Sequence, residues 1–206
     1  MGQGFTQIHP ELAALLPTSL HAACVTARHD KGTRLFATGY KPVHMFFIAS
    51  GEVVLERLGA KGSLVVLQRT RHGFVGEASL QSDRYHCDGR VVLTADITRV
   101  PVSHIRAAMD RDPAFASRWI AMLNREVRRL RLQCQRLSLN KVQDRLLHLL
   151  ETEGQDGRYA LGGGLKSLAG DLGVTHEALY RCVADAEKSG LLRREVGFLS
   201  LTRGER

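Results

Sequence analysis

Cysteine is scarce in this sequence, and no cysteine lies close to another. Cys24, Cys87, Cys134 and Cys182 form no CxxC pair, and no closely spaced set of histidine and cysteine surrounds them. Structural zinc sites require such spacing, so we expect reduced cytosolic thiols and no metal site.

Long apolar runs and catalytic motifs are also missing. No stretch approaches the roughly 18 to 20 apolar residues of a membrane span, and the chain does not open with a basic segment followed by an apolar run. We therefore expect a cytoplasmic protein with no membrane partner. No P-loop, GxSxG or HExxH motif occurs, so the sequence does not predict an enzyme.

What the chain does have is apolar content and positive charge. Its 206 residues, 44% of them hydrophobic, suffice for two small domains or one large one. A formal charge of +8 indicates an anionic partner. Nucleic acid is the first candidate, although an acidic membrane face or solubility alone fits the charge equally well.

Between residues 33 and 103, short apolar runs are separated by glycines, which is typical of a small antiparallel β domain. The hairpin turn is clearest at 59–63, and Gly39, Gly51 and Gly73 are expected at strand junctions. Short helices are expected at about 7–16 and at 103–109. The predicted strands are 34–36, 45–49, 52–58, 64–69, 91–95 and 98–102.

A long helix is predicted to follow, beginning where Asp112 can cap free amides and Pro113 suits the first turn. Apolar residues then recur every three or four positions. This stripe could pack on the chain's own β domain, form a parallel dimer seam, or do each on different turns. The predicted seam residues are Trp119, Leu123, Val127, Leu130, Cys134 and Leu137.

The strongest motif is LKSLAGDLGVTHEALYRCVA at 165–184, which predicts two helices meeting across a tight turn. Ala169 is small where the helices would cross, Gly173 suits a positive φ in the turn, and Thr175 can cap the second helix. A helix at about 139–151 and a glycine-rich break at 154–164 precede the motif, and a hairpin of 191–195 and 198–201 follows it. An ordinary helical hairpin is the alternative to a DNA-reading unit.

The exposed first turns of that second helix carry the side chains expected in a DNA major groove. A carboxylate and a guanidinium four residues apart can read cytosine and guanine, or can simply pair with each other on the helix surface. His176 could contact a base, a phosphate or only solvent. The predicted DNA-binding residues are Lys166, Thr175, His176, Glu177, Tyr180 and Arg181.

In this order of elements, the chain resembles the superfamily of the cyclic-AMP receptor protein and the fumarate-nitrate reduction regulator (CRP/FNR). The resemblance spans about 35–201 and is most specific at GFVGEASL (73–80) and THEALYR (175–181). It implies an α+β fold with an antiparallel β-roll of the jelly-roll type, a long dimerisation helix and a C-terminal winged helix-turn-helix. The implied domains are 1–112, 113–138 and 139–206, and the family's base-reading Glu and Arg correspond to Glu177 and Arg181.

The same resemblance argues against cyclic AMP bound by the family's usual clamp. Gly76 and Glu77 match the ribose-binding turn, but Cys87 and Asp88 stand where an Arg-Ser pair holds the phosphate. Asp88 would repel a phosphate, although Arg84 or Arg90 could substitute in a shifted register. The adenine-contacting pair of the long helix is replaced by Leu130 and Arg131. The predicted effector pocket comprises Gly76, Glu77, Ala78, Ser79, Arg84, Cys87, Asp88, Leu130 and Arg131.

The cofactor is left open by the sequence. Only Cys24 precedes the roll, too few thiols for the iron–sulfur cluster of the oxygen-sensing branch. A haem could be held through His44, His72, His86 or Cys87, but none has an identifying spacing. We expect a homodimeric regulator that binds palindromic double-stranded DNA and RNA polymerase. The alternative is a cyclic-nucleotide- or haem-binding module that regulates another protein.

Overall fold

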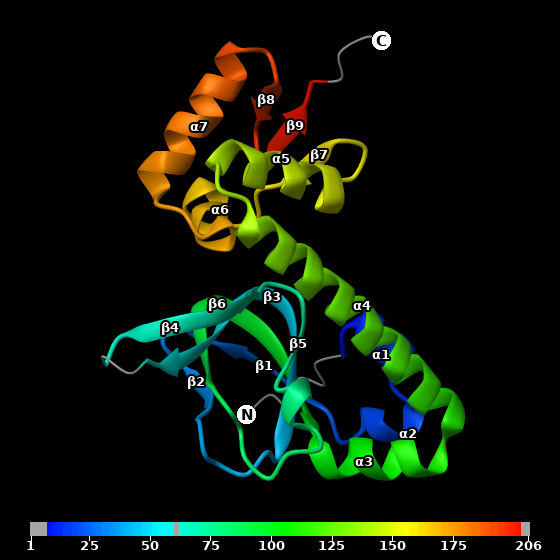
Figure 1. Cartoon of the computed structure of the whole chain (residues 1–206). Coiled ribbons are helices and arrows are strands. Elements are labelled where there is room, and N and C mark those ends of the chain that lie inside the picture. The colour runs from blue at the N-terminus through cyan, green and yellow to red at the C-terminus, as the bar shows by residue number, and fades with distance from the viewer. Residues whose placement is uncertain (1–7, 60–61, 203–206) are drawn as a thin grey trace. The chain divides into compact units, whose positions relative to one another are not determined.

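The computed structural model describes residues 8–59 and 62–202, and the chain divides into two compact units. Residues 1–122 form the first unit and residues 123–206 the second, with the long helix α4 (Pro113–Ser138) running from one into the other (Figure 1). No helix in the described ranges is long and apolar enough to cross a membrane.

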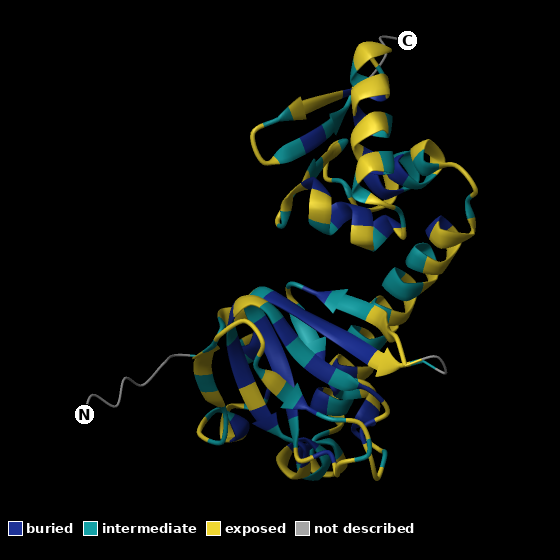
Figure 2. Cartoon of the chain, turned by 90° about the vertical axis from the view of Figure 1, so that its left-hand side faces the viewer, coloured by how far each residue is buried: buried dark blue, intermediate teal, exposed yellow. Residues whose placement is uncertain are grey.

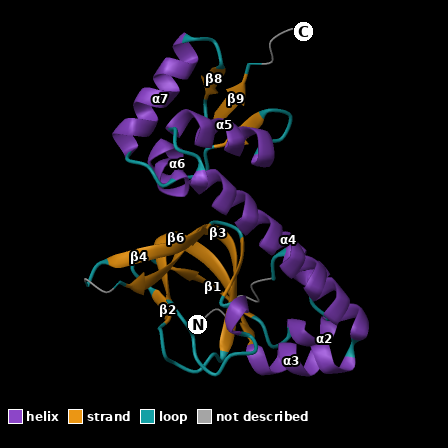
Figure 3. Ribbon diagram, viewed as in Figure 1, coloured by secondary structure: helices purple, strands orange, loops and turns teal. Residues whose placement is uncertain are grey.

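The first unit is an antiparallel β-roll with short helices at its ends (Figure 3). Its sheet has the order β1-β6-β3-β4, with β2 pairing with β6 and β5 pairing with β3. Its elements are α1 (Pro10–Leu15), α2 (Thr18–His21), β1 (Val25–His29), β2 (Arg34–Phe36), β3 (His44–Leu58), β4 (Leu64–Thr70), β5 (Gly73–Val75), the 3-10 turn η1 (Glu77–Ser79), β6 (Asp88–Pro101) and α3 (Val102–Arg111).

Two pairs of predicted strands are single long strands in the structure. The predicted strands 45–49 and 52–58 are both parts of β3, and 91–95 and 98–102 merge into β6, except that Val102 already belongs to α3. Gly51 permits the continuity of β3, because it has φ +87° and a Cβ there would lie 2.4 Å from the Thr94 carbonyl oxygen. The predictions of separate strands were therefore wrong.

Other elements were predicted closely or missed. Strand β2 has the predicted bounds, and Gly39 and Gly73 adopt positive φ as expected. Of the expected helix 7–16, residue 7 lies outside the described residues and α1 covers Pro10–Leu15. Elements α2, β1, β5 and β7 were not predicted.

The core of the roll fills the space between its strands with apolar side chains, which Figure 2 shows as dark blue along them. Alternate residues of β3 and β6 point inward, as the period of a strand requires. The core comprises Phe36, Phe46, Ile48, Val53, Leu55, Val75, Tyr85, Cys87, Val91, Ala95 and Ile97.

The second unit is a small helical domain backed by a three-stranded sheet of order β7-β9-β8. Its leucine-rich core joins all three helices to the sheet, because each helix turns one apolar face inward. Helix α5 begins at Val142, later than the predicted 139. Its elements are α5 (Val142–Glu153), β7 (Arg158–Ala160), α6 (Gly164–Leu172), α7 (His176–Lys188), β8 (Leu192–Glu195) and β9 (Phe198–Leu201). The predicted α+β class, β-roll and winged helix-turn-helix are thus confirmed.

Candidate nucleic-acid interface and effector site

The turn between α6 and α7 has the geometry that the sequence predicts. Gly173 adopts the left-handed conformation at φ 64°, ψ 37° and ends α6. The Val174 amide donates to the Ala169 carbonyl at 3.0 Å, and Ala169 is buried where the two helices meet. Only glycine adopts this backbone conformation without steric cost, so the sequence itself determines the bend.

Helix α7 is capped so that its first turns face solvent. The Thr175 hydroxyl accepts a hydrogen bond from the Ala178 amide at 3.2 Å, as predicted. Glu177 and Arg181 are exposed, and Tyr180 is 45% exposed with its ring 4.3 Å from that of His176. On the opposite face, α7 buries Leu179, Val183 and Ala186.

The charge on this surface is set locally. The Glu177 backbone amide, and then the Thr175 hydroxyl, stabilise the Glu177 carboxylate by hydrogen bonding and lower its pKa. No salt bridge joins Glu177 to Arg181 in the described part of the chain. An exposed carboxylate and an exposed guanidinium on one helix face have the chemistry to accept from cytosine N4 and to donate to guanine O6 and N7.

Lys166 and the hairpin of β8 and β9 are the other exposed candidates in this unit. Lys166 lies on the solvent side of α6. Val196 at the hairpin tip is fully exposed, and Gly197 makes the turn with φ 77°. Strand β7, which the sequence analysis missed, pairs with β9 and extends the hairpin into a three-stranded sheet.

Arg145 on α5 is a positioning residue that sequence reasoning missed. Its guanidinium donates to the Leu137 and Leu139 carbonyls at 3.1 and 2.7 Å, and to the Leu172 carbonyl at 2.9 Å. It thereby caps the carboxyl ends of α4 and α6 together. An arginine on an amphipathic helix gives no such signal in sequence, because it is equally suited to solvent.

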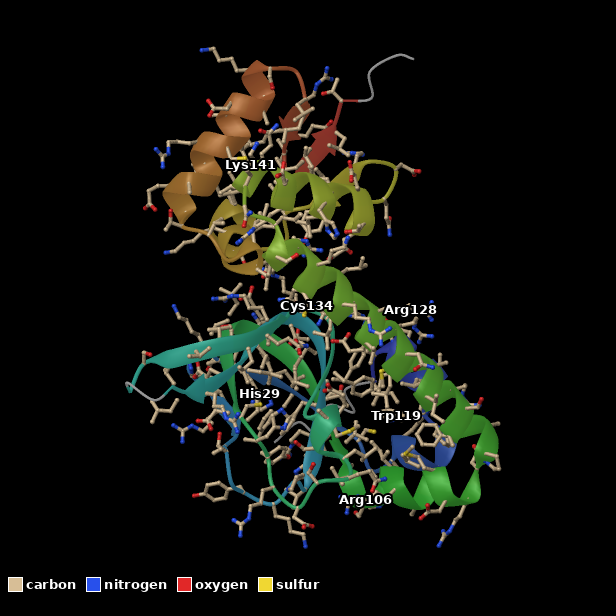
Figure 4. The ribbon with its side chains drawn as sticks, in the orientation of Figure 1. His29, Arg106, Trp119, Arg128, Cys134 and Lys141 are labelled. Carbon is tan, nitrogen blue, oxygen red and sulfur yellow. The ribbon has the colours of Figure 1, made fainter. Side chains whose placement is uncertain are left out.

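The predicted seam residues on α4 divide between two environments. Trp119, labelled in Figure 4, is fully buried in the first unit. Its ring centroid lies 5.2 Å from that of Phe74, so the indole is not available to a second chain. Val127 and Leu137 remain 44% and 40% exposed, and Cys134 is exposed as well. The sequence analysis overlooked Ile120, which is 55% exposed and stands seven residues before Val127.

The turn that the resemblance predicts to meet a ribose has the expected backbone, but the residues aligned with the phosphate clamp are engaged within the roll. Gly76 starts η1 with φ 86°, as a tight turn needs. Cys87 is buried, and this burial, followed by the charge of Asp88, raises the pKa of its thiol. Asp88 accepts hydrogen bonds from the Thr38 amide and hydroxyl, both at 2.7 Å, and these bonds lower its pKa. Asp88 therefore supports the connection between β2 and β3. Its negative charge is also unsuited to binding a phosphate.

The arginines that could replace the clamp are engaged elsewhere. Arg84 donates to the Gly39 carbonyl at 2.9 Å, and Arg90 forms a two-point ion pair with the buried Glu56 at 2.7 Å. Ala78 is exposed and Ser79 is buried beside the turn. Leu130 and Arg131 belong to the α4 segment of the second unit.

The predicted haem ligands do not converge on one point. His72 contacts Glu11 at 2.5 Å, and His86 lies 3.5 Å from the Ser79 hydroxyl. Desolvation, followed by the charge of Arg99, lowers the pKa of His44. Among the residues that the structure describes, no three histidine, cysteine or acidic side chains cluster as a metal site.

Comparison with known proteins bears on both units. Residues 27–112 match the family described as "Cyclic nucleotide-binding domain". None of the curated proteins matches the chain.

Three solved structures illustrate the structural similarity. FixK2 from Bradyrhizobium japonicum is 18% identical with a TM-score of 0.69, over 88% of this chain and 93% of that one. The c-di-GMP responsive global regulator CLP of Xanthomonas campestris is 21% identical with a TM-score of 0.61, over 89% and 96%. A transcriptional regulator of the CRP family from Thermus thermophilus is 18% identical with a TM-score of 0.58, over 85% and 91%. Residues 27–112 therefore match the cyclic nucleotide-binding domain family, and the chain has the fold of FixK2 and of the CRP-family regulator from Thermus thermophilus.

Proposed function

We propose that the chain is a homodimeric, sequence-specific DNA-binding transcription regulator, without enzymatic activity, whose β-roll responds to an effector. The observation that carries this proposal is the exposed first half of α7, where Glu177, Tyr180 and Arg181 project from a capped helix behind a left-handed glycine turn. The net charge of +8 supports an anionic partner. We divide the functions among 1–112 for sensing, 113–138 for dimerisation and 139–206 for DNA.

In this proposal Glu177 and Arg181 read bases, while Lys166, Thr175, His176 and Tyr180 contact the flanking backbone or base edges. A twofold dimer would present two α7 helices to successive major grooves. We therefore expect a palindromic site whose half-sites lie about one helical turn, roughly 10 to 11 base pairs, apart. RNA polymerase is the expected protein partner of a regulator with this fold.

Selection from random duplexes tests the reading of bases by Arg181. Arg181→Ala should weaken binding to the selected site by about 1–3 kcal/mol and relax the preference at one base pair of each half-site. Arg181→Lys is the matched control, because it keeps the charge and removes the planar fork. If Arg181→Ala returns the wild-type site with every preference intact, α7 is not the recognition helix.

The dimer is proposed to form along the exposed apolar stripe of α4. Ile120, Val127 and Cys134 are spaced by seven residues, as are Leu123, Leu130 and Leu137, which is the a/d pattern of a coiled-coil seam. Leu130→Asp would bury an unpartnered charge in that seam. We expect this variant to sediment as a monomer at micromolar concentration, whereas Arg125→Asp, at an exposed position opposite the seam, should remain a dimer. A dimeric Leu130→Asp would exclude the seam.

The roll is proposed not to bind cyclic AMP through the usual clamp, since Cys87 is buried and Asp88 is bound to Thr38. Calorimetric titration of the full chain with cyclic AMP should detect no binding of micromolar affinity. Micromolar affinity that disappears in Glu77→Ala would contradict this. If the chain also fails to bind DNA, that result would favour the alternative, a cyclic-nucleotide-binding module that regulates another protein.

A further inference from the structure

A cavity of about 380 Å³ opens in the first unit between β2, the connection 37–43 and the start of β3. Its volume falls within the range of small-molecule sites, roughly 300 to 1,000 Å³. Its described lining includes none of the residues predicted for the effector pocket. The cavity therefore lies beside the predicted effector residues and is lined by others.

The inner wall of the cavity is aromatic. Phe36 stacks on Tyr85 with ring centroids 4.3 Å apart, and on Phe46 at 5.6 Å. At the mouth, Tyr40 is 71% exposed and Val43 is 55% exposed. These three rings are stacked on one another and almost fully buried, so only their margins line the cavity, and an aromatic ligand would meet them by edge-to-face contact, which adds to the gain from burial.

The rim of the cavity is cationic. Arg34 and Lys41 both line it, and neither makes an ion pair or a side-chain hydrogen bond among the described residues. The lining that the structure describes contains no carboxylate, and Asp88, whose pKa is lowered by the Thr38 hydrogen bonds and to a lesser extent by the charge of Arg34, is hydrogen-bonded to Thr38. His44 also lines the cavity, and its lowered pKa keeps it neutral at pH 7.

The loop that forms the mouth is fixed by hydrogen bonds on both sides. The Gly39 amide donates to the Tyr85 carbonyl and the Tyr85 amide donates to the Tyr40 carbonyl, each at 2.8 Å. The Tyr85 hydroxyl donates to the His44 carbonyl at 2.6 Å, and Arg84 donates to the Gly39 carbonyl. A preformed site loses little ordering entropy when a ligand binds.

We propose that this cavity binds a small aromatic carboxylate. The ring lies against Phe36, Tyr85 and Phe46, and the carboxylate lies between Arg34 and Lys41. Arginine suits this anion because its planar fork donates two parallel hydrogen bonds to the two carboxylate oxygens. The proposal concerns ligand binding alone, so it stands or fails independently of DNA binding.

Saturation-transfer NMR and calorimetry of the full chain test the proposal with benzoate as the probe. Benzoate should bind at millimolar concentration or below. Benzyl alcohol, which lacks the charge, and acetate, which lacks the ring, should each bind at least about tenfold more weakly, because charged hydrogen bonds and ring burial are both needed.

Variants then locate the site. Arg34→Gln combined with Lys41→Gln should weaken benzoate binding at least about tenfold. Arg28→Gln combined with Lys31→Gln is the matched control, since both residues are exposed and lie outside the cavity lining. All four substitutions are at exposed positions, and an unchanged unfolding transition shows that the fold is kept. Absent benzoate binding, equal binding of benzyl alcohol, or unchanged binding in the Arg34/Lys41 variant would each overturn the proposal.

Discussion

The first turns of α7 and the segment of the roll predicted to hold a phosphate, residues 84–90, use their polar side chains in opposite ways. On α7, the cap and the apolar face position the helix and leave Glu177 and Arg181 in solvent. In the roll, each polar side chain has a partner within the fold. Asp88 bonds to Thr38, Arg90 to Glu56 and Arg84 to the Gly39 carbonyl. A polar group that is satisfied internally supports the fold, whereas an exposed one on a rigid helix is available to a partner.

The same contrast appears along α4. Trp119 fills the core of the first unit, while Val127 and Leu137 expose apolar surface in the second. Both groups belong to one sequence pattern of apolar residues three or four apart. Burial separates the residue that stabilises the unit from the apolar residues that stay exposed on this chain.

Trp119→Ala tests the buried side of this contrast and should have the largest effect. Removing a fully buried indole that contacts Phe74 and Phe115 should lower the free energy of unfolding of the first unit by about 3–5 kcal/mol. Urea denaturation followed by circular dichroism measures this, since Trp119 is the single tryptophan and its fluorescence is lost. Ile120→Ala is the control, and its loss of stability at protein concentrations too low for dimers should be small. A Trp119→Ala protein as stable as wild type would mean that the indole is not part of the core.

Gly173→Ala probes the rigid support of α7. A Cβ at φ 64° is sterically strained and would lie 3.0 Å from Leu137, so we expect a loss of about 1–2 kcal/mol in the second unit. Gly170→Ala, within α6, should instead be neutral or stabilise the helix by up to about 1 kcal/mol. Thermal unfolding of the two variants gives the comparison. Equal effects would show that the left-handed turn imposes no constraint.

Asp88→Asn should have the smallest effect, and only its pH dependence is diagnostic. Hydrogen bonds from Thr38 lower the pKa of Asp88 in the folded chain. The resulting stability is present above the unfolded value, about pH 4, and is lost as the pH falls through the lower folded pKa. The difference in unfolding free energy between wild type and Asp88→Asn should therefore shrink below about pH 4 in urea titrations. A difference that is constant with pH would contradict a structural role for the Asp88 carboxylate, and Asp83→Asn at an exposed position is the control.

Much of the helix-turn-helix of α6 and α7 was predictable because its determinants are local. Gly173 ends α6 and Thr175 caps α7, and each role depends only on residues a few positions away. The hairpin after Gly190 likewise follows from its turn residues. Strand continuity in the roll was not predictable. Gly51 suggests a break in sequence, but in the sheet it allows β3 to approach β6 closely.

The sequence alone determined the order of β-roll, long helix and winged helix-turn-helix, and the capped helix that carries Glu177 and Arg181. Periodicity, caps and turn residues act between near neighbours and can be read along the chain. Only the tertiary structure decided that Trp119 faces its own unit, that Arg145 caps two helices, that Asp88 binds Thr38, and that Arg34 and Lys41 both line a cavity with Phe36 and Tyr85. Each of these depends on contacts between segments far apart in sequence, and a side chain's chemistry does not state which distant partner it will meet.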